Sequence, residues 1–115
     1  MARIRHIAVM TADVPKLPDF YKNVFGLKEV SRGKRSIYLS DGYINMAILP
    51  AGDGQEGIDH FGFEVEDLQR TADSALEAGA QQGPRDLPRD GRFAEVFIKD
   101  PSGQRVDLSK QGWKT

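Results

Sequence analysis

Residues 57–67 read GIDHFGFEVED, and this stretch decides the fold. Its apolar residues alternate with His60, Gly62 and Glu64, and a period of two predicts a β-strand. One face of that strand carries the His60 imidazole beside Gly62, a residue with no side chain, which leaves room for a ligand to approach. The face that enters the core carries Phe61, Phe63 and Val65.

The N-terminal stretch 3–11, RIRHIAVMT, repeats this pattern of an alternating strand with a histidine. Each of the two stretches leads into a helical segment, DVPKLPDFYKNVFG at 13–26 and LQRTADSALEAGA at 68–80. Asp13 is the expected N-cap of the first helix, and Gly26 is its expected C-terminal stop. One buried stripe is expected on it, formed by Leu17, Phe20, Tyr21, Val24 and Phe25. Further strands are expected at 27–31, 35–40, 43–49, 80–87, 93–99 and 104–109.

This order gives the pattern βαβββ twice in 115 residues, a length that suits a single domain. The predicted class is α+β, with module 1 at about 1–54 and module 2 at about 55–115. The helices would cover one side of the sheets. The other sides of the two modules would form cupped mixed sheets.

Composition excludes several classes of protein. A net charge of −1 gives no field for nucleic acid or anionic membrane, and no apolar run approaches a membrane span. The absence of cysteine excludes disulfides, thiolate zinc sites and a cysteine nucleophile. The N-terminus enters a strand directly, without a signal-peptide core, and a cytoplasmic location is expected.

Strand parity brings the chemically useful side chains to the face opposite the helices. His6, Asn45, His60 and Asp107 all fall on that face. Two neutral imidazoles with one carboxylate suit Fe(II), Mn(II), Zn(II) or Ni(II). The alternatives are structural histidines, an Asp107 that is a solvated strand end near Lys110 and Lys99, and an Asn45 that hydrogen-bonds a neighbour or a substrate.

Glu95 falls on the same face and is the candidate general base, since a carboxylate in a partly dry site has a raised pKa. Its alternative role is an ion pair with Arg92 or Arg105, and Arg105 is also a candidate substrate-binding residue. Four aromatic residues are expected to line a substrate pocket, or else to belong to ordinary core: Tyr38, Tyr43, Phe93 and Phe97.

Three stretches together resemble the vicinal oxygen chelate superfamily, which includes glyoxalase I, extradiol dioxygenases and the fosfomycin-resistance and bleomycin-binding proteins. They are RHIAVMTADVPKLPDFYKNVFGLKEV, DHFGFEVEDLQ and FIKDPSGQRVDLS. By this resemblance His6, His60 and Asp107 match the metal ligands of the family, and Asn45 matches the remaining ligand position. Asp107 is one methylene shorter than the usual glutamate and Asn45 is uncharged. The pattern is therefore closer to the extradiol set of two histidines and one carboxylate than to a glyoxalase centre.

Two functions follow from the resemblance. The first is a metal-dependent lyase, isomerase or dioxygenase that holds Fe, Mn, Ni, Co or Zn and acts on a small substrate with vicinal oxygens. The second is a metal-free protein of the bleomycin-resistance type that binds or sequesters a small molecule. The resemblance also implies a homodimer.

Overall fold

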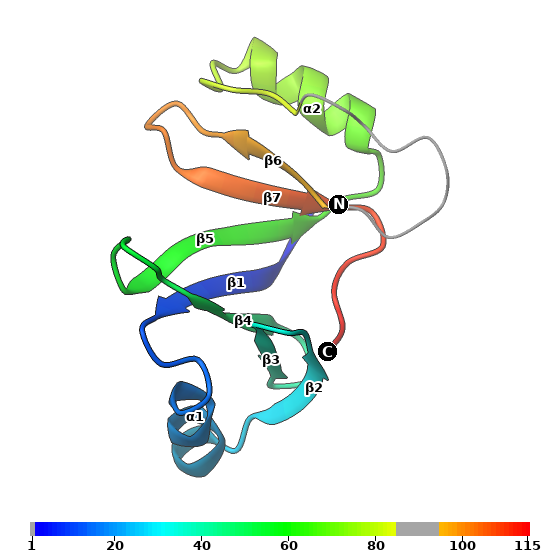
Figure 1. The fold of residues 1–115 in the computed structure, drawn as a ribbon. Helices are drawn as coiled ribbons and strands as arrows, with labels where there is room; N and C mark the ends of the chain where they lie inside the picture. The colour runs from blue at the N-terminus through cyan, green and yellow to red at the C-terminus, as the bar shows by residue number, and fades with distance from the viewer. Residues whose placement is uncertain (1, 85–94) are drawn as a thin grey trace. The chain divides into compact units, whose positions relative to one another are not determined.

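A computed structural model describes residues 2–84 and 95–115, which form a mixed sheet of seven strands and two helices (Figure 1). Within one part of the chain the strands follow the order β2-β3-β4-β1, and within the other they follow β5-β7-β6. The predicted α+β fold is confirmed. The elements are β1 (Arg3–Thr11), α1 (Leu17–Phe25), β2 (Lys28–Arg32), β3 (Ile37–Ser40), β4 (Asn45–Pro50), β5 (Gly57–Glu64), α2 (Leu68–Glu77), β6 (Val96–Lys99) and β7 (Arg105–Ser109).

The strand predicted at 80–87 is only partly within the described residues. Between 80 and 84 the chain makes one antiparallel bridge, Gln82 with Lys99, and no longer strand. The remainder of that prediction, and the start of the strand predicted at 93–99, lie outside the described residues.

Internal packing divides the chain into two compact units, one of which comprises His6–Asp59 and Lys114–Thr115. In this unit β1 runs parallel to β4, and β3 lies antiparallel to β4 and β2. Alternation along the strands sends one set of side chains into an apolar core, as period two predicts. That core consists of Val9, Ile37, Leu39 and Ile48.

The second unit comprises Met1–Arg5 and His60–Trp113. Here β5 runs parallel to β7, and β6 lies antiparallel to β7. The apolar face of β5 packs as its alternation predicts, because Phe61 and Phe63 pack against the buried cluster of Val65, Val106 and Leu108. The boundary between modules near residues 54 and 55 stays a prediction.

The stripe predicted for α1 is wrong in part. Leu17 and Tyr21 pack against the core and Pro18 is buried, but Phe20, Val24 and Phe25 are exposed. Pro18 lies 100° around the helix axis from Leu17, so the buried side of α1 is rotated toward it and away from Phe20 and Val24. The apolar residues of α1 span a wide arc of the helix, so the sequence permits burial of either the Pro18 side or the Phe20 side.

The helix ends follow capping chemistry. Gly26 takes φ 73°, the left-handed conformation of a C-terminal stop, as predicted. Asp13 is not the N-cap of α1, which is Lys16, but its carboxylate accepts the Lys16 N–H at 3.1 Å one turn earlier. In α2, Asp67 is the N-cap and accepts the Arg70 N–H at 3.0 Å. No helix in the described part of the chain is long and apolar enough to cross a membrane.

Candidate metal and acid–base site

Asn45 fixes the tautomer of the neutral His6 imidazole. The two residues are register partners on β4 and β1, both are buried, and His6 Nδ1 lies 2.9 Å from Asn45 Oδ1. The Asn45 Nδ2 group donates to the Lys114 carbonyl at 2.9 Å. Because only the amide nitrogen can donate to that carbonyl, Oδ1 faces His6 and accepts from Nδ1–H. Neutral His6 therefore carries its lone pair on Nε2, the arrangement found in metal-ligating histidines.

The Asn45 carboxamide is thus engaged with two neighbours within its own unit. This corresponds to one of its predicted alternatives, hydrogen bonding to a neighbour. A direct role for Asn45 in substrate binding stays a prediction. Its observed contacts suit a residue that orients an imidazole.

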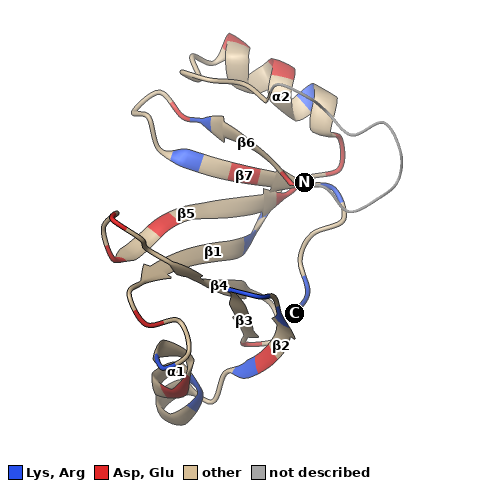
Figure 2. Ribbon diagram, viewed as in Figure 1, with Lys and Arg blue, Asp and Glu red and all other residues tan. Residues whose placement is uncertain are grey.

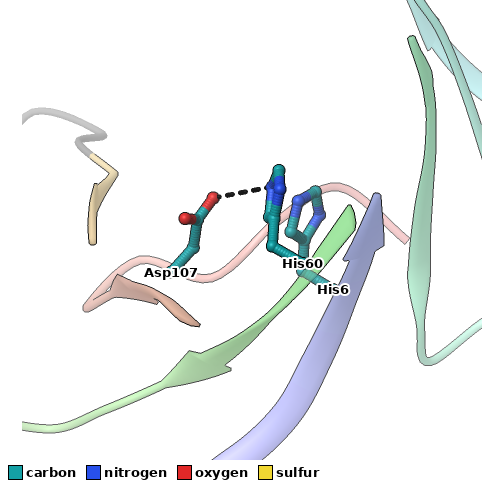
Figure 3. Close-up of side chains that lie close together, drawn as sticks. All are labelled: His6, His60 and Asp107. Atoms are coloured by element: carbon teal, nitrogen blue, oxygen red, sulfur yellow. Dashed lines mark ion pairs between the residues drawn. The ribbon is translucent and has the colours of Figure 1, made fainter. Parts of the chain in front are cut away.

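In the other unit, His60 on β5 faces Asp107 on β7 (Figure 3). Their side chains are 6% and 1% exposed, and His60 Nε2 lies 3.1 Å from Asp107 Oδ2. Two ligand atoms bound at right angles to one ion, with bonds near 2.1 Å, are themselves about 3 Å apart. Without an ion this contact is a hydrogen bond from His60 to Asp107, and the same separation fits two ligands of a single divalent ion once His60 Nε2 has lost its proton.

The carboxylate of Asp107 is also fixed from its other side. Arg105 Nε donates to Asp107 Oδ1 at 2.9 Å, and the Arg105 guanidinium lies over the Phe97 ring at 4.7 Å from its centroid. The alternative that Asp107 is a solvated strand end is wrong, because the residue is buried and paired. Phe97 and Arg105 both lie beside Asp107, and their predicted role in substrate binding stays a prediction.

The pKa of Asp107 is lowered from 3.8 to about 2. Burial raises this pKa, but hydrogen bonds from His60 and Arg105 stabilise the anion and outweigh burial. Asp107 therefore remains a carboxylate, the form that a metal ion requires.

Glu95 is perturbed in the opposite direction. Although much of the residue is exposed, burial of its carboxyl group raises its pKa, and a hydrogen bond with the Asp107 carboxylate raises it further. The Trp113 indole N–H donates to Glu95 Oε1 at 2.7 Å and lowers the pKa only in part. Two neighbouring carboxyl groups with pKa values displaced in opposite directions suit an anionic ligand and a proton-transfer group.

The expected room for a ligand at Gly62 is filled by Trp113. A Cβ atom built on Gly62 would lie 2.8 Å from Trp113 Cη2 and 3.2 Å from Asp107 Cβ. Gly62 and Asp107 are register partners, and Asp107 also pairs with Phe97 on β6. Glycine is therefore needed at this position for an indole of the same chain. Trp113 also donates to the Glu95 carboxylate, a contact that the sequence pattern did not predict.

Gly62→Ala is expected to lower the free energy of unfolding by about 1 kcal/mol, because the methyl group displaces the indole. The chain has a single tryptophan, so its emission reports this displacement directly. A red-shifted emission maximum with a lower urea midpoint is expected. Gly54→Ala, on an exposed turn, provides the comparison for the emission maximum, because its new methyl group would meet the Ala51 carbonyl and not the indole. An unshifted emission maximum in Gly62→Ala would show that the indole is not packed there.

For the other aromatic residues predicted to line a substrate pocket, the structure shows only their exposure and their strand or turn. Tyr38 is half-buried on β3, and its strand position shares a sheet face with His6 through the register Tyr38–Ala47–Ala8. Tyr43 is exposed in the turn before β4. Phe93 and Arg92 lie outside the described residues.

Among the described residues, each unit contributes buried side chains that could ligate a metal ion, His6 in one unit and the adjacent His60 and Asp107 in the other. Their donor set of two imidazoles and one carboxylate matches Fe(II), Mn(II), Co(II), Ni(II) or Zn(II). The chemistry of the residues present therefore fits a divalent ion.

Solved structures of this fold support the architecture. A hypothetical protein from Bacillus halodurans C-125 superimposes with a TM-score of 0.76 at 15% identity, covering 99% of this chain and 97% of that one. A methylmalonyl-CoA epimerase in complex with methylmalonyl-CoA gives 0.73 at 22% identity, covering 95% and 94%. Homoprotocatechuate 2,3-dioxygenase from Brevibacterium fuscum, with 3,4-dihydroxyphenylacetate, gives 0.74 at 19% identity, covering 98% of this chain and 37% of that one.

The family model described as the Glyoxalase/Bleomycin resistance protein/Dioxygenase superfamily matches residues 3–108. This range contains both histidine-bearing strands and the strand that carries Asp107. The chain therefore belongs to the Glyoxalase/Bleomycin resistance protein/Dioxygenase superfamily.

Proposed function

We propose that this protein is a metal-dependent enzyme in which His6, His60 and Asp107 bind one divalent ion and Glu95 transfers a proton. Its substrate is a small molecule with two neighbouring oxygens. The observation that carries the proposal is the buried pair of His60 and Asp107, flanked by a second carboxyl group whose pKa is raised. A buried imidazole and two carboxyl groups with opposite pKa shifts indicate a reactive site.

Each residue has a separate task in this proposal. Asn45 holds the His6 ring with Nε2 as the acceptor nitrogen, and Arg105 fixes the Asp107 carboxylate. When bound, the ion would polarise both substrate oxygens and stabilise negative charge developing on them. Glu95 would take up or return the proton, since its raised pKa brings it closer to neutral pH.

The class of reaction within the superfamily is an isomerase, lyase or dioxygenase. A proton-transferring Glu95 favours isomerisation or epimerisation, in which a proton leaves and returns at carbon. Solvent-deuterium incorporation into a methylmalonyl thioester and dioxygen uptake with 3,4-dihydroxyphenylacetate separate these reactions. Activity with neither, together with tight binding of a ligand to metal-free protein, would favour the sequestering function.

We also infer a homodimer in the cytoplasm. The support for a dimer is an exposed apolar face on α1, where Phe20, Val24 and Phe25 are 54%, 58% and 64% exposed. Aromatic and aliphatic side chains in one cluster on a short helix commonly mark a contact surface. Sedimentation velocity of wild type and of Phe20→Ser would test the dimer. A single monomeric species in wild type would contradict it.

Metal titration of the chelator-treated protein tests the proposed function. A ligand at 100 times its dissociation constant stabilises the fold by about 2.7 kcal/mol. For a domain of this size, at least one of the five ions is expected to raise the melting temperature by several degrees. Mg(II) is the control ion, because it prefers oxygen ligands in octahedral geometry. No shift with any of the five ions would contradict the metal-dependent function.

A further inference from the structure

A cavity lies at the turn between β2 and β3, within the unit formed by His6–Asp59 and Lys114–Thr115. Its volume of about 340 Å³ falls in the range of small-molecule sites. The apolar part of its lining includes Val14, Pro15, Ile37 and Pro50. Such walls suit the carbon skeleton of a ligand.

The other part of the lining is strongly basic. Arg32, Lys34 and Arg35 all line the cavity, and no acidic residue is among the described residues that do so. Figure 2 shows Lys and Arg in blue in this turn. Arg32 is paired with Glu29 at 2.7 Å, whereas Lys34 and Arg35 have no acidic partner in the described chain. Two cations are therefore available to an incoming anion.

The turn that presents these cations has a defined conformation. The Gly33 N–H donates to the Ser36 carbonyl at 2.9 Å and closes the turn. A Cβ atom on Gly33 would lie 2.6 Å from Ser36 Oγ, so the hydroxyl group packs directly against the glycine. A closed turn places Lys34 and Arg35 at the cavity with a smaller entropic cost of binding than an open loop would.

This cavity is separate from the candidate metal site. Ala12, at its edge, follows the end of β1, six residues after His6 in the chain. An extended strand rises about 3.3 Å per residue, so the two positions are about 20 Å apart. A ligand of the size that fits this cavity would not reach His6.

We propose that the cavity binds a phosphate monoester with an apolar body, independently of the metal site. Lys34 and Arg35 contact the phosphate group, and the walls formed by Val14 and Pro15 contact the apolar body. Arg and Lys together are common phosphate ligands, Arg through its planar fork and Lys as a compact charge. The proposal concerns a site outside the proposed reaction.

Titration calorimetry with phenyl phosphate tests this site. The variant Lys34→Gln/Arg35→Gln removes both unpaired cations at exposed positions. Lys16→Gln/Lys28→Gln is the matched control, because it removes two exposed cations of the same unit outside the cavity. Loss of a charged hydrogen bond costs about tenfold or more in affinity. The first variant is expected to bind at least about tenfold more weakly, and the control to bind like wild type.

Titrations with two further ligands, inorganic phosphate and benzoate, define the class of ligand. Inorganic phosphate is expected to bind more weakly than phenyl phosphate, because it lacks the apolar body. Benzoate is expected to bind more weakly as well, because it carries one charge and two oxygens. Equal binding of phenyl phosphate by wild type and Lys34→Gln/Arg35→Gln, or none by wild type, would overturn the site. Tighter binding of benzoate would overturn the phosphate assignment.

Discussion

Replacing His60 with alanine is expected to weaken divalent-ion binding by more than about 100-fold. Loss of a residue that only orients a ligand typically costs 10- to 100-fold, and loss of the ligand itself should cost more. The cavity left behind is buried next to Asp107, so the remaining carboxylate would also lose the partner that lies 3.1 Å away. Calorimetric titration with Mn(II), Co(II), Ni(II) and Zn(II) measures the change.

Asp59→Asn is the matched control for this experiment. Asp59 is the preceding residue of β5, is exposed and points to the other side of the strand. The Asp59→Asn variant removes one negative charge next to His60 in the chain without removing a candidate ligand. Its affinity for the divalent ion is expected to stay within about twofold of wild type, the range of a screened surface charge. Equal weakening in both variants would show that the effect of His60→Ala is general electrostatics rather than coordination.

Acid is expected to remove about 2 kcal/mol of stability through Asp107. Its pKa is about 2 in the folded protein and 3.8 when unperturbed, and each pKa unit corresponds to 1.36 kcal/mol. A lowered pKa in the fold means that the stabilisation is complete above pH 4. It declines as the pH falls toward 2, since the unfolded chain takes up the proton first.

The measurement is urea unfolding from pH 5 to pH 2 in the presence of chelator, for wild type and Asp107→Asn. The difference in unfolding free energy between the two proteins should shrink toward pH 2. Glu95 acts with the opposite sign, because its raised pKa makes the folded state take up the proton first on acidification. A difference that stays constant from pH 5 to pH 2 would contradict a stabilising ionised Asp107.

The alternation of apolar and polar residues along the strands was sufficient to predict most of the fold. The core positions of β1, β4, β5 and β7 follow period two, because each of these strands has one face against apolar side chains. The same parity put His6 beside Asn45 across two strands, and His60 and Asp107 on neighbouring strands of the second unit. Parity predicts the shared face, whereas the strand register that makes these residues neighbours comes from the structure.

What the sequence could not predict depends on rotation and on long-range packing. In α1 the apolar residues span a wide arc, so the pattern could not determine whether Pro18 or Phe20 faces the core. The position of Trp113 over Gly62 joins a segment after the last strand to the middle of β5. A glycine beside a histidine was a signal of close approach, but a ligand and an indole produce the same signal.

The most direct test of the proposed metal centre is X-ray absorption spectroscopy of the zinc-loaded protein. The chain contains only two histidines, so the number of coordinating imidazoles identifies them. We expect two imidazole nitrogens at about 2.0–2.1 Å and at least one carboxylate oxygen at about 2.0–2.2 Å, at close to one ion per chain. A bound ion with one imidazole or none would contradict a centre formed by His6, His60 and Asp107.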